Sequence, residues 1–129
     1  MATYLLDSGI LIDLLNGKRG RGELIARLIG QGDELASCSV TITEVHAGMR
    51  PGEEAKTERF LRSLKFHPVA YETAKAAGAL QNSWRRRGQT LSLPDATIAA
   101  VAVEHGLVLV TANAKHYPMP ELSLYPLPG

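Results

Sequence analysis

Cysteine, long apolar runs and an excess of either charge are all missing from this sequence, and each absence excludes a class of protein. Cys38 is the only cysteine, which excludes an internal disulfide and a metal site built from several cysteines. No stretch approaches the ~20 consecutive apolar residues of a transmembrane helix. No basic segment followed by a signal-peptide core stands at the N-terminus. We therefore expect a cytoplasmic protein without a membrane partner.

The balance of charge excludes a chain that is strongly basic as a whole. Lysine and arginine number 14, aspartate and glutamate 13, and the formal net charge is +1. Any contact with nucleic acid must therefore come from a local patch. A length of 129 residues with 45% hydrophobic and 21% charged residues is ordinary for one globular domain. With no internal repeat or low-complexity tract, the sequence predicts a single domain over residues 1–129.

Short apolar runs alternate with helical patterns along the chain. This order predicts an α/β fold with a mainly parallel central sheet of four to five strands flanked by helices. Pro68 indicates that its strand is an edge strand or a strand end. The expected strands are 4–6, 35–40, 66–69, 107–110 and 123–125, and the expected helices are 8–16, 23–29, 41–49, 53–64, 71–87 and 93–105.

The first apolar run ends on a carboxylate, Asp7, and a helical pattern begins at Ser8. Ligands of open parallel sheets bind just beyond the carboxyl ends of the strands, so Asp7 is well placed to hold a cation. It is equally well placed to cap the helix that follows. This segment alone leaves both interpretations open.

Two further acids stand at comparable places in the chain. Glu44 lies early in the helix after the second strand, and Asp95 lies in the first turn of a mostly apolar helix. An acid near a helix N-terminus stabilises it by roughly 0.3–1 kcal/mol, so each could be structural. Glu44 interrupts a run of apolar and β-branched residues, and burying it unpaired is costly. It therefore needs a cation or a basic partner such as Lys115 or an arginine.

The loop after the most apolar strand contributes Thr111, Asn113 and His116, which a parallel sheet would bring to the same edge as Asp7. Carboxylates, an amide and hydroxyls together suit Mg²⁺ or Mn²⁺ rather than zinc. The four histidines show no spacing typical of zinc ligands.

Two basic clusters are candidates for phosphate contacts. Lys18, Arg19 and Arg21 occupy a glycine-rich connector, which a solvated loop explains as well. The second cluster ends the long helix, where cations also suit the negative end of the helix dipole. It comprises Arg85, Arg86 and Arg87.

Four motifs in register resemble the PIN-domain ribonucleases, and most closely the VapC toxins of bacterial VapBC toxin–antitoxin pairs. One such motif would be weak support, but their order and spacing match over essentially the whole chain. The motifs are LLDS at 5–8, SVTITEVHAG at 39–48, LPDA at 93–96 followed by IAA at 98–100, and LVTANAKHY at 109–117.

The resemblance implies an endoribonuclease that uses one or two Mg²⁺ or Mn²⁺ ions and cuts structured RNA such as tRNA or rRNA. Asp7, Glu44 and Asp95 fall on the family's three core acidic positions, which makes all three the expected catalytic residues and metal ligands. Ser8 and Thr111 fall on its small polar positions.

This sequence departs from the family pattern in the loop after the strand at 107–110. Asn113 stands where a fourth acid is common, and His116 where a further acid often stands. Asparagine still offers a neutral oxygen but removes one negative charge, which bears on whether a second ion binds.

The resemblance also implies a protein partner. It is a cognate VapB-like antitoxin that wraps the toxin and blocks its site, and DNA would be bound only through that antitoxin. A homodimer is expected, or a heterotetramer or larger complex with the antitoxin. The helices at 53–64 and 71–84 offer candidate surfaces, although core packing explains many of their small and apolar residues.

The sequence also allows two other interpretations. A receiver-type signalling domain shares the fold class, but it needs an aspartate at the end of a central third strand, and 66–70 contains no acid. The second interpretation is a catalytically inert PIN-like module that binds RNA or a partner. Its only support is Asn113, which stands in place of the fourth acid.

Overall fold

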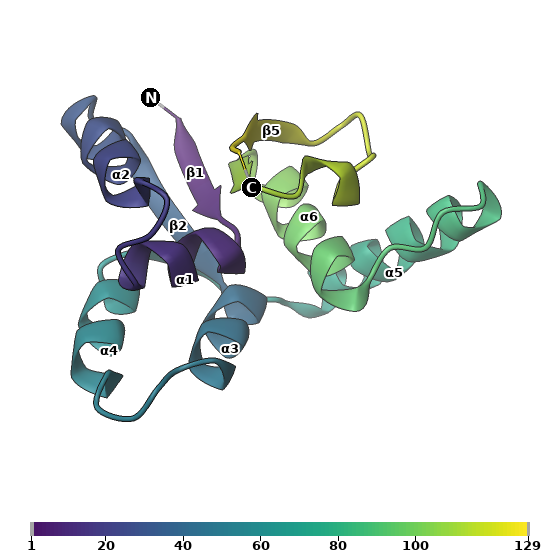
Figure 1. Cartoon of the computed structure of the whole chain (residues 1–129). Coiled ribbons are helices and arrows are strands. Elements are labelled where there is room, and N and C mark those ends of the chain that lie inside the picture. Colours follow the sequence, from purple (N-terminus) through teal and green to yellow (C-terminus); the bar gives the residue numbers. More distant parts are fainter. Residues whose placement is uncertain (1, 129) are drawn as a thin grey trace.

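The computed structural model describes residues 2–128 and contains alternating strands and helices (Figure 1). A short 3-10 turn, η1, lies between the last two strands. The elements are β1 (Thr3–Leu6), α1 (Ser8–Leu15), α2 (Arg21–Gly30), β2 (Glu34–Cys38), α3 (Ser39–Ala47), α4 (Glu54–Arg62), β3 (Lys65–His67), α5 (Tyr71–Arg86), α6 (Leu93–His105), β4 (Val108–Thr111), η1 (Ala114–His116) and β5 (Ser123–Pro126).

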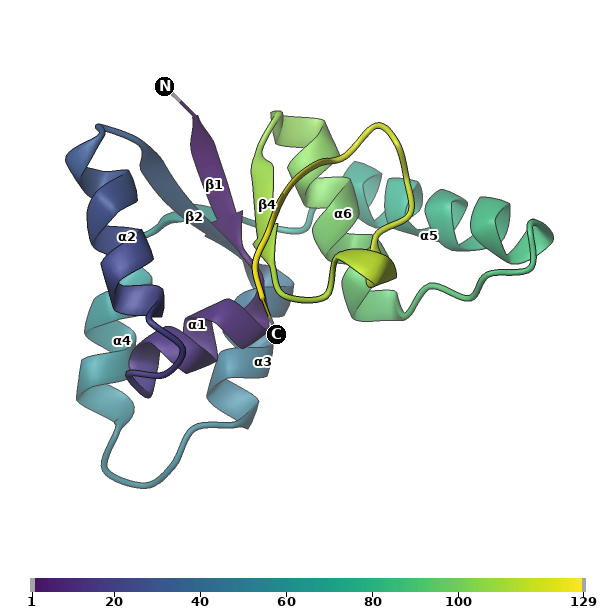
Figure 2. The ribbon, with the colours of Figure 1, turned by 45° about the horizontal axis from the view of Figure 1, so that its top comes forward.

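The strands form one five-stranded sheet in the order β3-β2-β1-β4-β5. Every neighbouring pair is parallel. Helices cover both faces, with α5 and α6 on one side of the sheet and α2 on the other (Figure 2). The predicted α/β fold with a parallel sheet is therefore confirmed. The third strand lies at an edge, as Pro68 indicated, whereas a receiver domain requires it at the centre.

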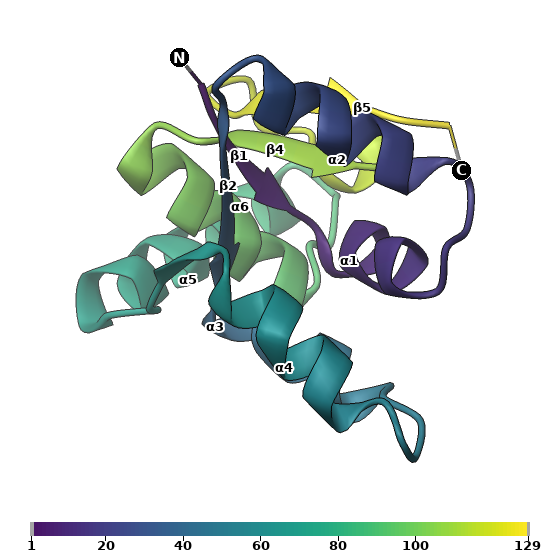
Figure 3. The ribbon, with the colours of Figure 1, turned by 90° about the vertical axis from the view of Figure 1, so that its left-hand side faces the viewer.

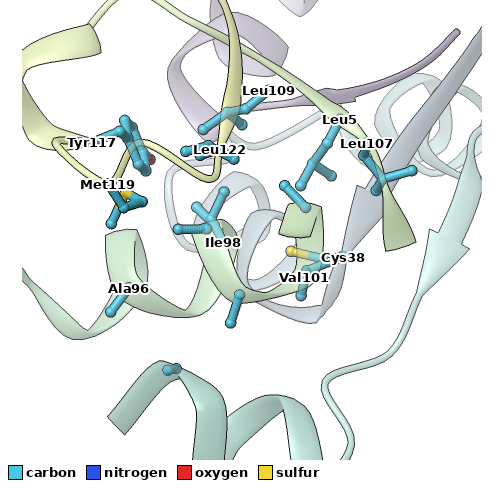
Figure 4. Close-up of a cluster of buried hydrophobic side chains, with 14 of the residues drawn as sticks. Leu5, Cys38, Ala96, Ile98, Val101, Leu107, Leu109, Tyr117, Met119 and Leu122 are labelled. Atoms are coloured by element: carbon cyan, nitrogen blue, oxygen red, sulfur yellow. The ribbon is translucent and has the colours of Figure 1, made fainter. Parts of the chain in front are cut away.

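Adjacent residues of the central strands point to opposite faces of the sheet and build two cores. Leu5 is in register with Leu109 and Ala36, and these three pack in the core beneath α5 and α6 (Figure 4). Leu6 is in register with Val110, and both pack in the core that α1, α2, α3 and α4 cover. Because both faces are buried, the strands read as continuous apolar runs.

Capping residues set both boundaries of α6. Helix α6 spans the predicted residues, because the Ser92 hydroxyl accepts the backbone N–H of Asp95 and Gly106 ends the helix with φ 63°. The next strand then starts one residue later than predicted, since the Leu107 N–H still bonds to the Ala102 carbonyl.

The segment at 17–22 is only partly the connector that its glycines suggested. Arg21 begins α2, and its side chain is only 4% exposed. Its guanidinium donates to the Pro128 carbonyl at 2.8 Å and faces Asp13 at 3.7 Å. Arg21 therefore ties α2 to the end of the chain and to α1.

Across the described residues, no helix combines the length and the apolar character that crossing a membrane would require.

Candidate metal centre

The centre of the candidate site is the carboxyl end of β1, where this strand leads into α1 beside β4 (Figure 3). Leu6 pairs with Val110, and the Asp7 N–H continues this ladder by donating to the Val110 carbonyl at 3.0 Å. Asp7 and Thr111 thus meet at the same edge of the sheet, as the parallel arrangement predicted.

Asp7 takes the capping role that its sequence position left open, and a neighbouring strand fixes the rest of its carboxylate. One carboxylate oxygen, Oδ1, accepts the Ser8 N–H at 2.7 Å and caps α1. The other, Oδ2, accepts the Thr111 hydroxyl at 2.8 Å. With a side chain 9% exposed, Asp7 is fixed in orientation by both neighbouring elements.

Glu44 reaches the same edge from α3. Its Oε1 accepts the hydroxyl of Ser8, whose backbone N–H donates to Asp7. Ser8 therefore links Glu44 to Asp7. Glu44 is half-buried, and among residues 2–128 it forms no ion pair with lysine or arginine. The basic partner that sequence reasoning left open, Lys115 or an arginine, is therefore not paired with Glu44.

Asp95 reaches the site from the first turn of α6. Its Oδ1 accepts the Tyr117 hydroxyl at 3.1 Å, and its Oδ2 lies 3.4 Å from Nδ1 of His116. The same Tyr117 hydroxyl lies 3.4 Å from Oδ2 of Asp7. Tyr117 therefore links two of the acids, and His116 adds the only basic contact to them in the described part of the chain.

Within residues 2–128, the acids of the site have no lysine or arginine partner, and His116 is their only basic neighbour. Burial raises the pKa of Asp7 above its usual value, and the charges of Asp95 and Glu44 raise it further. Burial also raises the pKa of the Tyr117 phenol, and the charges of Asp7 and Asp95 raise it further. A bound cation would relieve the mutual repulsion of these carboxylates.

The donor set fits a hard divalent cation, although no ready-made cage exists. Within residues 2–128, no three His, Cys, Asp or Glu side chains stand close enough together to enclose an ion. Mg²⁺ does not need such a cage, because it commonly keeps several waters and binds through one or two carboxylates. Asp7 and Asp95, which face a common hydroxyl, are the residues best placed to hold it.

Two residues expected in the site contribute less directly. The Asn113 side chain is exposed, while its backbone N–H donates to the Thr111 hydroxyl at 3.0 Å and so helps to fix it. His116 is exposed, and its imidazole lies 3.4 Å from Asp95.

The basic residues divide into those that are engaged and those that face solvent. Arg21 is buried and structural, and Arg19 forms an ion pair with Asp13 at 2.9 Å. Lys18 is exposed. The arginines that end α5 are exposed as well, with Arg87 lying 4.6 Å above the Trp84 ring.

A hollow of about 310 Å³ opens beside Glu44, between the N-terminal turns of α3 and α6. Its walls are mainly apolar and include Val40, Leu93 and Pro94. Leu93 is 66% exposed despite its size.

Tyr117 is the site residue that sequence reasoning missed. In the sequence it is only the last residue of the motif at 109–117. A tyrosine close behind Asn113 and His116 in a loop at the active edge was the available signal, because a buried phenol must find a hydrogen-bond partner.

Comparison with known proteins identifies the family of the chain. The family profile described as "PIN domain" matches residues 4–122. The chain therefore belongs to the PIN-domain family. Within that family it is similar to the VapC proteins. Ribonuclease VapC19 of Mycobacterium tuberculosis is 33% identical over 115 residues, which cover 89% of this chain and 92% of the relative. Ribonuclease VapC2 of Haemophilus influenzae is 27% identical over 91% of each chain.

Solved structures give the same result. A toxin–antitoxin complex from Klebsiella pneumoniae contains a chain with 29% identity and a TM-score of 0.77, covering 96% of this chain and 99% of that one. VapBC2 from Rickettsia felis, bound to a DNA fragment from its promoter, shares the fold with a TM-score of 0.84 at 22% identity. That match covers 97% of this chain and 98% of the other. The resemblance to VapC toxins inferred from the sequence motifs is confirmed.

Proposed function

We propose that this chain is the toxin of a type II toxin–antitoxin pair and acts as an endoribonuclease that depends on Mg²⁺ or Mn²⁺. The observation that carries the proposal is the arrangement of Asp7, Glu44 and Asp95 around the end of β1. Ser8 and Tyr117 link these acids, and none of them has a lysine or arginine partner among the described residues. The relatives named ribonucleases support it from sequence.

Asp7 and Asp95 would hold the cation through oxygen atoms, which favours Mg²⁺ or Mn²⁺ over zinc. A bound ion of this kind supplies Lewis acidity, which activates water and offsets charge on a phosphodiester. Ser8 orients Glu44, whose carboxylate can accept a proton from the attacking water. Thr111 fixes the second oxygen of Asp7. Asn113 in place of an acid favours one tightly bound ion over two.

RNA would approach across the edge of the sheet that carries the acids. The exposed arginines at 85–87 and Lys18 are available for phosphate contacts, whereas Arg21 is not, because its side chain is buried. The apolar hollow beside Glu44 has room for an unpaired base, which protein sites commonly hold against apolar or planar groups. Structured RNA with exposed loops, such as tRNA or rRNA, is the expected substrate class.

A cognate VapB-like antitoxin is the expected protein partner. Relatives of the same fold are described in complexes with antitoxins, and two of them with DNA. A homodimer of this chain, alone or within a larger complex with the antitoxin, remains our expectation for the assembly. We place the protein in the cytoplasm, where its RNA substrates are.

The test is cleavage of total tRNA and rRNA in Mg²⁺ or Mn²⁺ by the native chain and by the Asp7→Ala and Asp95→Ala variants. We expect cutting by the native chain alone, and its loss in EDTA. Equal cutting by all three proteins would overturn the assignment. RNA binding without cutting by the native chain would favour the inert module instead.

A further inference from the structure

Tyr117 occupies a position that core packing explains only in part. Its side chain is 3% exposed and belongs to the core cluster with Met119, Ile98 and Ala96 (Figure 4). A phenylalanine ring would fill the same space. The hydroxyl adds nothing to this apolar packing, and burying it without a partner would destabilise the fold.

The partners of that hydroxyl are the two aspartates expected to hold the cation. Asp95 lies 3.1 Å from the phenol oxygen and Asp7 lies 3.4 Å from it. A phenol has a single proton to donate, and the nearer aspartate is the better acceptor. Asp7 already accepts the Thr111 hydroxyl on the same oxygen at 2.8 Å. The phenol therefore donates its hydrogen bond mainly to Asp95.

Asp95 needs such a contact more than Asp7 does. Asp7 is fixed by Ser8 and Thr111 as well, whereas the only other side chain that contacts the Asp95 carboxylate in the described chain is the exposed His116 at 3.4 Å. Asp95 also comes from α6 rather than from the sheet edge. The Tyr117 hydroxyl is thus the direct link between the acid on α6 and the acid after β1.

We propose that Tyr117 is a positioning residue whose hydroxyl holds the Asp7 and Asp95 carboxylates as a preformed pair for one divalent cation. This inference rests on the proposed function. The energetic reason is that ligands fixed before binding lose less conformational freedom when the ion arrives. Hydrogen-bonding groups behind metal ligands commonly change metal affinity or activity by 10–100-fold.

The test replaces Tyr117 with phenylalanine, which keeps the ring and removes only the hydroxyl. The probe is Mn²⁺ alone, and its Kd is measured by calorimetry, with the fold checked by circular dichroism. The matched control is Tyr125→Phe, because Tyr125 is a half-buried ring that packs on Tyr4 in β1 and, among the described residues, makes no hydrogen bond to Asp7 or Asp95. Asp7→Ala reports on the site itself.

We expect the Kd for Mn²⁺ to rise about tenfold or more in Tyr117→Phe and to stay native in Tyr125→Phe. Cleavage of RNA by Tyr117→Phe should recover when Mn²⁺ is raised, whereas cleavage by Asp7→Ala should not. A native Kd in a folded Tyr117→Phe protein would overturn the positioning role and leave the proposed function standing. Native Mn²⁺ binding by Asp7→Ala would overturn the metal site, and the positioning role with it.

A second measurement leaves Tyr117 unchanged. It tests the positioning role even if Tyr117→Phe does not fold. The native chain is labelled with ¹³C at the tyrosine Cζ, and the Tyr117 resonance is identified by elimination from the variants of the other three tyrosines. Titration with Mg²⁺ should shift this resonance along the same binding curve as the ion. An unchanged Tyr117 resonance at saturating Mg²⁺ would overturn the inference.

Discussion

Replacing Asp7 with asparagine should separate the catalytic role of this residue from its structural one. Asparagine caps helices as well as aspartate does, and its Oδ1 can still accept the Ser8 N–H that now lies at 2.7 Å. The raised pKa of Asp7 means that its negative charge costs stability in the metal-free fold, and asparagine removes that charge. We therefore expect Asp7→Asn to melt within a few degrees of the native chain.

Asp7→Ala is expected to be less stable than Asp7→Asn. It loses the cap, which contributes about 1 kcal/mol. It also leaves the fully buried Thr111 hydroxyl without its acceptor, at a cost of about 1–3 kcal/mol. The difference between the two variants should thus be about 2–4 kcal/mol, because the relief of charge repulsion is common to both and cancels. At about 2–8 °C per kcal/mol, calorimetry resolves it.

RNA cleavage, unlike stability, should be affected to the same extent in the two variants. Both variants lose a carboxylate that we propose to hold the cation, so RNA cleavage should fall by at least about 100-fold in each, despite their different stabilities. Asp33→Asn is the matched control, because Asp33 lies just before β2, at the amino end of the strands, and accepts the Ala2 N–H. Native cleavage by Asp7→Asn would refute the reasoning, and unfolding of Asp7→Asn would return Asp7 to a purely structural role.

The remaining predictions concern the rest of the site and the fold around it. Ser8→Ala should leave the fold intact and lower kcat about 10–100-fold, because Glu44 loses the hydroxyl that orients it; a native kcat would exclude that role. Arg21→Ala should lower the melting temperature without changing RNA affinity, whereas Arg85→Ala with Arg86→Ala should weaken RNA binding, flatten its salt dependence and spare stability, as fluorescence anisotropy and calorimetry would measure. Burial lowers the pKa of His67, helped by the charges of His105 and Lys65 and opposed by those of Glu34 and Glu104. Since the folded chain then binds this proton less readily than the unfolded chain, the stability linked to His67 is complete above pH about 6.5 and is lost as the pH falls below it. Urea unfolding at pH 7.5 and 5.5 should show a smaller loss for His67→Phe than for the native chain, and an equal loss would contradict this reading.

Local sequence signals predicted the fold well because short-range chemistry determines most of it. Ser92 and Gly106 define the ends of α6, and the apolar runs around Leu5 and Leu109 mark strands buried on both faces. The parallel sheet then brings Asp7 and Thr111 together without further information. Glu44 and Asp95 are placed in the same site by the family resemblance rather than by the sheet pattern, because an acid early in a helix can be purely structural.

What escaped prediction depends on contacts between residues far apart in the sequence. Arg21 lies among glycines and reads as part of a loop, but a carbonyl more than a hundred positions away, that of Pro128, fixes it in the core. Tyr117 reads as a packing residue until its hydroxyl is seen between Asp95 and Asp7. Only the folded chain reveals these pairings, since neither has a local signature.

The central claim is that the acids at the end of β1 and the start of α6 hold a divalent cation. The most direct measurement is the anomalous scattering of Mn²⁺ in crystals of the native chain grown with this ion. We expect a peak in contact with the carboxylates of Asp7 and Asp95, and its absence from crystals of Asp95→Asn. A peak elsewhere, or none in a protein that cleaves RNA under the same conditions, would contradict it.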